Sequence, residues 1–312
     1  MGPSGRNAFP LVPRYRLTGL PFGSARSARR GRGSDLAGFR AYVPGDPIST
    51  IDWRASAKLS TARADDEFVV RERFADDAPS VVVFVDRRPS MSLYPDWSPW
   101  LCKPEAVRVA TGAIVESAVA ARGAAGYLDL ATSPDGSDGP FWIAPRGRSP
   151  LEQTDLRIRT APFDAPAGSL TRGLEELTRP ATSLGTGSFV FLVSDFLEPP
   201  PDRLWLVGLA RRWELVPVVI QDPVWEQSFP VIGPVIVPIA DPVDGAVLEV
   251  RLTRSEARAE RERREGARSE LLAKITSKGL DPVLLESSEQ DSIVGAFHEW
   301  AERRRRALWL RR

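Results

Sequence analysis

The chain has 312 residues, of which 42% are hydrophobic and 27% charged, and its formal net charge is +1. These values are ordinary for a globular protein, so they exclude a disordered chain and give no overall attraction to nucleic acid. One cysteine (Cys102) and one histidine (His298) exclude thiolate metal clusters, disulfide frameworks and most histidine-based catalytic triads. The longest apolar runs are too short to cross a bilayer and the N-terminus lacks a signal-peptide core, so we expect a cytoplasmic protein.

Residues 1–33 are rich in Gly, Pro, Ser and Arg, and they include a basic run at residues 26–33. This composition predicts a basic, flexible arm. The alternative is that the basic run binds phosphate or an acidic surface.

Residues 34–78 contain the turn sequence Pro44-Gly45-Asp46-Pro47, with aromatic and aliphatic residues on both sides of it. One interpretation is a loop whose aromatic residues pack onto the core. The other is a recognition surface that includes Asp46 and Trp53. The apolar residues at 68–74 predict a strand that leads into the central one.

An unbroken apolar run at residues 81–85 is followed directly by Asp86, and a second run at residues 189–193 is followed by Ser194 and Asp195. Runs without alternation and rich in β-branched residues are typical of strands buried on both faces of a parallel sheet. Ligands bind at the carboxyl ends of such strands. The sequence therefore predicts a site at Asp86 and Asp195.

Strand and helix patterns alternate along most of the chain, although residues 132–167 look loop-rich. This alternation predicts an α/β fold with a doubly wound, mostly parallel sheet. We expect a core over residues 79–225 and an extension over residues 226–312 that completes the sheet with small β and helical additions. The predicted strands are 126–131, 141–144, 215–220, 235–239, 246–252 and 282–285, and the predicted helices are 104–122, 169–177, 202–212 and 255–278.

Hydroxyl groups accompany the two acids, because Ser90 and Ser169 fall on loops at the same edge of the predicted sheet. Converging carboxylates and hydroxyls are the ligand type that Mg²⁺ prefers. The alternative is that Asp86 and Ser169 only cap helices or turns.

The series Asp86-x-Arg88-x-Ser90, Gly168-Ser169 and Ser194-Asp195 resembles the metal-ion-dependent adhesion site of a von Willebrand factor A domain. That family has Asp-x-Ser-x-Ser, a Thr after a Gly, and an Asp after a strand. With Tyr42-Val-Pro-Gly-Asp46 and Ile51-Asp-Trp53, the chain resembles one subgroup, the bacterial domain-of-unknown-function family fifty-eight. Its genes commonly accompany those of MoxR-type AAA+ ATPases, so the resemblance implies such a partner.

Two residues depart from that pattern. Ser169 replaces the Thr and keeps a hydroxyl. If the helical spacing of Leu170 and Leu174 sets the alignment with the family pattern instead, Gly168 takes the Thr position and that hydroxyl is lost. Arg88 replaces the first Ser and brings a guanidinium beside Asp86 and Asp195, where it could stand in for the metal ion. Two hypotheses follow: a degenerate, metal-free site neutralised by Arg88, or a site that still binds Mg²⁺.

The resemblance implies a non-enzymatic protein-interaction module that assembles or remodels a complex together with a MoxR-type ATPase. Aromatic residues dominate binding hot spots, so we expect the partner to contact Tyr94, Trp97, Trp100 or Trp53, with Asp46 nearby. One alternative is a Mg²⁺-dependent phosphohydrolase with Asp86 as nucleophile, although Arg88 occupies the place of its usual second acid. The other is nucleic-acid binding through residues 26–32 and 303–306.

Overall fold

The computed structural model describes residues 7–14, 36–42, 51–63, 68–73, 79–93, 100–133, 136, 139–145, 150–179, 182, 184–231, 235–240 and 247–310. The chain forms two compact units. The large unit comprises Met1–Arg14 and Ser80–Arg312, and the small unit comprises Tyr15–Pro79. The small unit is therefore inserted between two segments of the large one.

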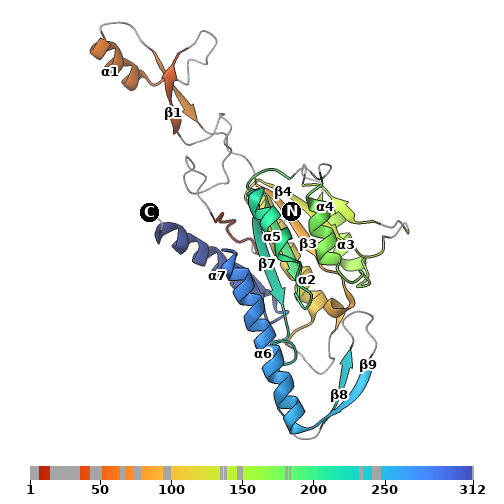
Figure 1. The fold of residues 1–312 in the computed structure, drawn as a ribbon. Helices are drawn as coiled ribbons and strands as arrows, with labels where there is room; N and C mark the ends of the chain where they lie inside the picture. Colours follow the sequence, from red (N-terminus) through yellow and green to blue (C-terminus); the bar gives the residue numbers. More distant parts are fainter. Residues whose placement is uncertain are drawn as a thin grey trace. The chain divides into compact units, whose positions relative to one another are not determined.

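A six-stranded sheet forms the centre of the large unit, with the strand order β10-β7-β6-β3-β4-β5 (Figure 1). All neighbouring strands are parallel except β5, which runs antiparallel to β4. The strands are β3 (Ser80–Val85), β4 (Ala124–Asp129), β5 (Phe141–Ile143), β6 (Phe189–Ser194), β7 (Glu214–Ile220) and β10 (Val283–Leu285). The predicted α/β fold with a mostly parallel sheet is confirmed.

Helices cover both faces of this sheet, which explains why β3 and β6 lack apolar and polar alternation. Val81, Val83 and Val85 face the core beneath two helices, α2 (Lys103–Ala120) and α7 (Gln290–Leu310). Val82 and Phe84 face the opposite core, which is covered by α4 (Ser169–Leu177), α5 (Asp202–Ala210) and α6 (Arg254–Ser277). Because both faces are covered, each strand residue can be apolar.

The chain reverses its direction of winding at β3, whose two neighbours in the sheet are β4 and β6. In doubly wound sheets such a reversal opens a crevice at the carboxyl ends of the strands. Asp86 directly follows β3 and Asp195 directly follows β6. The fold thus places both acids at the switch point.

A helix that the sequence analysis missed, α3 (Pro150–Thr160), packs against α2 and β4. It is held by a buried ion pair: Arg157 donates to Asp129 at the end of β4, with Nε–Oδ2 and Nη2–Oδ1 distances of 2.9 and 2.6 Å. The flanking turn residues made residues 132–167 look loop-rich, and they obscured this helix.

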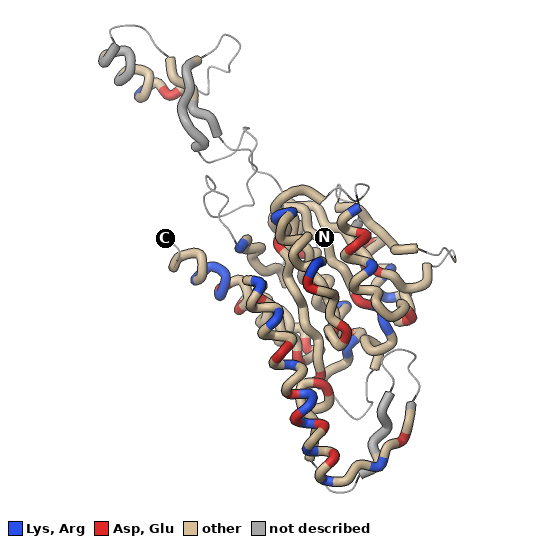
Figure 2. Tube along the Cα trace, in the orientation of Figure 1, with Lys and Arg blue, Asp and Glu red and all other residues tan. Residues whose placement is uncertain are grey.

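Beyond β7, an antiparallel hairpin of β8 (Val235–Ala240) and β9 (Val247–Leu252) leads into α6. A capping box between Thr253 and Glu256 starts that helix. Basic and acidic residues are interspersed along its length (Figure 2), and several form ion pairs three or four residues apart, such as Arg264 with Glu260. This mixture of charges is typical of a solvent-facing helix.

The N-terminal residues differ from the predicted arm, because residues 7–14 lie against the core of the large unit. Phe9 is buried and stacks on Phe297 of α7, with ring centroids 4.4 Å apart. Arg14 donates from its backbone N and its Nε to Glu214. Phe9 and Val12 both belong to the buried core that also contains side chains of α2 and α7, so this part of the predicted arm is corrected. The basic run at 26–33 lies outside the described residues.

The small unit contains a two-stranded antiparallel sheet of β1 (Leu36–Ala41) and β2 (Val69–Arg73), together with α1 (Trp53–Arg63). The strand predicted at residues 68–74 is β2, which precedes the central strand β3 in the chain and pairs with β1. The segment predicted to form a loop contains the helix α1. Asp52 starts α1 by accepting hydrogen bonds from the backbone N–H groups of Arg54 and Ala55.

Candidate functional site

Asp86 and Asp195 lie on neighbouring strand ends and are almost completely buried. Their strands are in register, with Val85 opposite Val193, and Asp86 N donates to Val193 O at 2.9 Å. Two carboxylates buried side by side repel each other and lose hydration, so they require cations or strong donors close by. The structure provides both.

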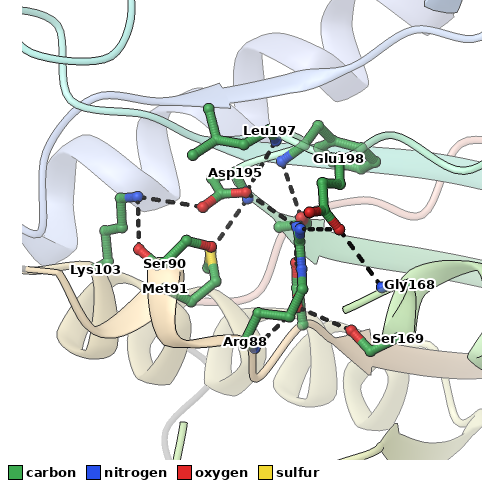
Figure 3. Close-up of polar contacts among 12 residues, drawn as sticks. Arg88, Ser90, Met91, Lys103, Gly168, Ser169, Asp195, Leu197 and Glu198 are labelled. Atoms are coloured by element: carbon green, nitrogen blue, oxygen red, sulfur yellow. Dashed lines mark hydrogen bonds and ion pairs between the residues drawn. The ribbon is translucent and has the colours of Figure 1, made fainter. Parts of the chain in front are cut away.

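Arg88 is the main cation (Figure 3). Its Nε lies 3.1 and 3.0 Å from the two oxygens of Asp86, its Nη2 lies 2.7 Å from Asp86 Oδ2, and the same Nη2 reaches Asp195 Oδ1 at 3.3 Å. The third guanidinium nitrogen, Nη1, lies 3.0 Å from Glu198 Oε2. Arg88 therefore binds three carboxylates while its own side chain is only 3% exposed.

Hydroxyl groups complete the surroundings of Asp86. Ser194 Oγ donates to Asp86 Oδ2 at 2.7 Å, and Ser169 Oγ lies 3.4 Å from Asp86 Oδ1. Ser169 is the first residue of α4 rather than its N-cap, which is Gly168. The structure thus brings Ser169 to the site in the predicted register.

A second cation, Lys103, was missed by the sequence analysis. Its Nζ donates to the Ser90 carbonyl at 2.9 Å, lies 3.4 Å from Asp195 Oδ2, and pairs with Glu226. Lys103 is the first residue of α2, where the helix dipole disfavours a positive charge. A lysine at this unfavourable position in the sequence could have indicated that its charge is compensated by a carboxylate from another element.

The electrostatics of the cluster follow from burial and these pairings. Burial opposes the charged form of Asp195, but the charges of Lys103 and Arg88 outweigh it and hold the pKa of Asp195 below its usual range. Burial also opposes the charge on Lys103, but Glu226 and Asp195 raise the pKa of Lys103. For Glu226, burial dominates over the attraction of Lys103, so its pKa is raised.

These residues do not fit Mg²⁺ as they stand. Guanidinium and ammonium groups already contact Asp86 and Asp195, the two carboxylates that would bind the ion. Among the described residues, no group of three or more Asp, Glu, His or Cys side chains could hold a metal ion. Ser90, one of the two predicted hydroxyl ligands, is buried on a short 3₁₀ turn, η2 (Pro89–Ser92), and its carbonyl accepts a hydrogen bond from Lys103.

The structure describes two of the predicted partner-binding residues, Trp100 and Trp53, one on each unit. Trp100 is half-buried and its indole Nε1 donates to Asp222 Oδ2 at 3.0 Å, so it packs within the large unit. Trp53 is 60% exposed on the small unit and meets Phe68 edge to face, with ring centroids 5.9 Å apart. Tyr94, Trp97 and Asp46 lie outside the described residues.

The basic run at residues 303–306 is largely engaged in ion pairs. Arg303 pairs with Asp281, and Arg305 pairs with Glu302. Arg304 is buried against Glu214, and burial lowers its pKa to about 10 although that glutamate acts in the opposite direction.

The strand order and the paired acids at the switch point define a doubly wound α/β protein. The chain belongs to the family described as "Protein of unknown function DUF58", which matches residues 38–270. The family to which the sequence motifs pointed is thus confirmed. Among the described residues, no helix is both long and apolar enough to cross a membrane.

Uncharacterised proteins from Mycobacterium tuberculosis and Mycobacterium bovis are 27% identical over 302 residues, which cover 96% of this chain and 88% of theirs. Among solved structures, the conserved hypothetical protein BatB from Bacteroides thetaiotaomicron is 12% identical, with a TM-score of 0.40 over 72% of this chain and 99% of that one. The pilus adhesin SpaC from Lactobacillus rhamnosus GG is 13% identical, with a TM-score of 0.43 over 74% and 31% of the two chains.

Proposed function

We propose that this protein is a non-enzymatic protein-interaction module that works with a MoxR-type AAA+ ATPase to assemble or remodel a protein complex. The observation that carries the proposal is the aromatic pair on the small unit, in which Trp53 is 60% and Phe68 45% exposed. Adjacent exposed aromatic rings are typical of binding hot spots. The choice of partner follows from the family resemblance.

The surroundings of Asp86 support a role without catalysis. A nucleophilic carboxylate needs one oxygen directed at a substrate. Both oxygens of Asp86 accept hydrogen bonds from Arg88, and Ser194 adds a further one. In this proposal Asp86 therefore serves to hold Arg88 and does not act as a nucleophile.

The site also supports binding that does not depend on metal. In this proposal Arg88 and Lys103 replace the ion, because they bring positive charge to the two acids that would otherwise bind it. The pairing of Arg303, Arg304 and Arg305 with carboxylates favours a protein partner over nucleic acid.

The test is capture of a purified MoxR-type ATPase from the same organism on the immobilised protein, measured by biolayer interferometry. We expect equal affinity in EDTA and in Mg²⁺, with nucleotide absent, and at least about a tenfold loss in Trp53→Ala. Trp309→Ala is the matched control, because Trp309 is 61% exposed on α7 of the large unit.

Absence of capture would overturn the proposed function, and an equal loss in both tryptophan variants would overturn the assignment of the surface. Capture that disappears in EDTA and returns with Mg²⁺ would overturn the metal-free site.

A further inference from the structure

The Arg88 guanidinium has an inner and an outer side. Nε and Nη2 are directed at the buried Asp86 and Asp195, whereas Nη1 is directed at Glu198 on the loop after β6 (Figure 3). The Glu198 side chain is 42% exposed, while that of Arg88 is 3% exposed. Among the described residues, Nη1 is thus a fixed cationic donor whose carboxylate partner, Glu198, is also in contact with solvent.

The backbone at the start of α4 supplies a second donor to the same carboxylate. Gly168 N lies 3.5 Å from Glu198 Oε2, the oxygen that also contacts Arg88. Gly168 has a φ of 72°, a left-handed conformation that glycine adopts without strain, and it caps the N-terminus of α4. The positive end of the helix dipole therefore adds to the attraction of Arg88 for an anion.

We propose that Arg88 Nη1 and Gly168 N–H form a carboxylate-binding site, that Glu198 occupies it as an internal ligand, and that an acidic side chain of the protein partner displaces Glu198. This inference rests on the proposed function, because it names the group on the partner that the large unit recognises. The inner contacts of Arg88 with Asp86 and Asp195 stay in place during the exchange.

The exchange avoids the usual cost of opening a buried ion pair. Removing one partner of such a pair leaves an uncompensated charge, but here one carboxylate replaces another and Arg88 remains paired. Asp86 holds the guanidinium in position beforehand, so little side-chain freedom is lost on binding. Glu198, once displaced, is free to enter solvent.

The backbone of the loop after β6 places Glu198 against Arg88. Phe196 has a φ of 52°, which is unusual for a residue with a side chain, and it is buried against Trp205 with ring centroids 6.1 Å apart. Leu197 N donates to Asp195 Oδ1 at 3.0 Å. These contacts anchor the loop up to Leu197 and leave the exposed side chain of the next residue, Glu198, as the part that exchanges.

The test uses acetate as the probe and acetamide as its neutral counterpart, followed through the Gly168 amide resonance of the ¹⁵N-labelled full chain. Glu198→Gln removes the internal carboxylate and keeps the shape of the side chain. We expect acetate to shift the Gly168 resonance saturably in Glu198→Gln, with about fivefold weaker binding in the native protein, and acetamide to have no effect.

Glu175→Gln is the matched control, since Glu175 also pairs with an arginine, Arg203, and its side chain is 48% exposed. It should behave like the native protein. No saturable acetate shift in Glu198→Gln, or an equal shift with acetamide, would overturn the carboxylate site.

The capture assay separates this inference from the proposed function. If a partner carboxylate uses the site, Glu198→Gln captures the ATPase about fivefold more tightly than the native protein. Capture that is lost in Trp53→Ala but unchanged in Glu198→Gln would overturn the inference and leave the proposed function standing. Absence of capture by every variant would overturn the proposed function, whatever the acetate result.

Discussion

At the scale of single residues, the site is a buried network of opposite charges. Asp86, Asp195 and Glu226, together with the partly exposed Glu198, contribute four carboxylates, and Arg88 and Lys103 contribute two cations. The carboxylates are in excess, and Glu226, whose pKa is raised by burial, takes up a proton more readily than Asp195, whose pKa is lowered. Such a network adds little net stability, but loss of any one buried member is costly because a charge is then left buried and unpaired.

The pH dependence of folding should reveal the charge on Asp195. Its folded-state pKa is below the ordinary value of 3.8, so its contribution to stability is complete above that pH and is lost as the pH falls through the folded-state pKa. We expect Asp195→Asn to lower the free energy of unfolding by about 3–5 kcal/mol at neutral pH. Below pH 3.8 the difference in the free energy of unfolding between the native protein and Asp195→Asn should narrow, because a protonated aspartic acid is uncharged like asparagine.

Urea denaturation from pH 3 to pH 7 measures this difference. Ser92→Ala serves as the control, because Ser92 is exposed and its hydroxyl donates to the carbonyl of Pro89 within the same short turn. A constant difference between the native protein and Asp195→Asn across the whole range would contradict the assigned pairing.

At the scale of elements, the position of α4 depends on one glycine. A Cβ at Gly173 would collide with the buried ring of Phe84 on β3, so only glycine allows α4 to lie this close to the sheet. This close approach brings Ser169 and Gly168, at the start of the helix, within reach of Asp86 and Glu198.

We expect Gly173→Ala to destabilise the fold by about 1–3 kcal/mol through overpacking. Gly112→Ala on α2 is the matched control: an added Cβ has no atom within 4 Å, so the higher helix propensity of alanine should stabilise the protein by up to about 1 kcal/mol. Thermal unfolding followed by circular dichroism measures both variants. Equal effects of the two substitutions would show that α4 can move away from the sheet without cost.

Most strands of the large unit could be predicted from the sequence, because a strand buried on both faces leaves an unbroken apolar run. The helices α1 and α3 could not. Residues 53–63 form a short polar helix whose start depends on Asp52, and α3 depends on the distant pairing of Arg157 with Asp129. Long-range ion pairs leave no periodic pattern in the sequence.

The same distinction holds for the candidate site. Four of its residues lie next to strand or helix ends, so the pattern that predicts the elements also predicts that these residues lie close together: Asp86, Arg88, Ser169 and Asp195. Lys103 and Glu226 reach the site from α2 and from the turn after β7, and only the folded chain shows that they meet.

At the scale of the whole molecule, the two ends of the described chain share one core. Phe9 lies edge to face with Phe191 of β6 and Trp300 of α7, with ring centroids 6.1 and 5.9 Å apart. Its backbone N donates to Ser117 Oγ of α2 at 2.9 Å. Residues 7–14 therefore pack together with the helices that cover one face of the central sheet.

We expect Phe9→Ala to lower the free energy of unfolding by about 3–5 kcal/mol, since it removes a fully packed aromatic ring. Phe9→Leu, which keeps much of the apolar volume, should cost less than about 1.5 kcal/mol. Urea denaturation followed by tryptophan fluorescence measures both. A loss below 1 kcal/mol in Phe9→Ala would mean that residues 7–14 contribute little to the core.

This shared core also constrains the order in which the protein can fold as it is synthesised. Arg304 donates to the carbonyl of Val12, 292 positions earlier in the chain. At about 5–20 residues per second, a ribosome needs roughly 15–60 s to make the intervening chain. During that time Phe9 and Val12 cannot pack against α7, so this part of the core can form only after the last described helix has been made.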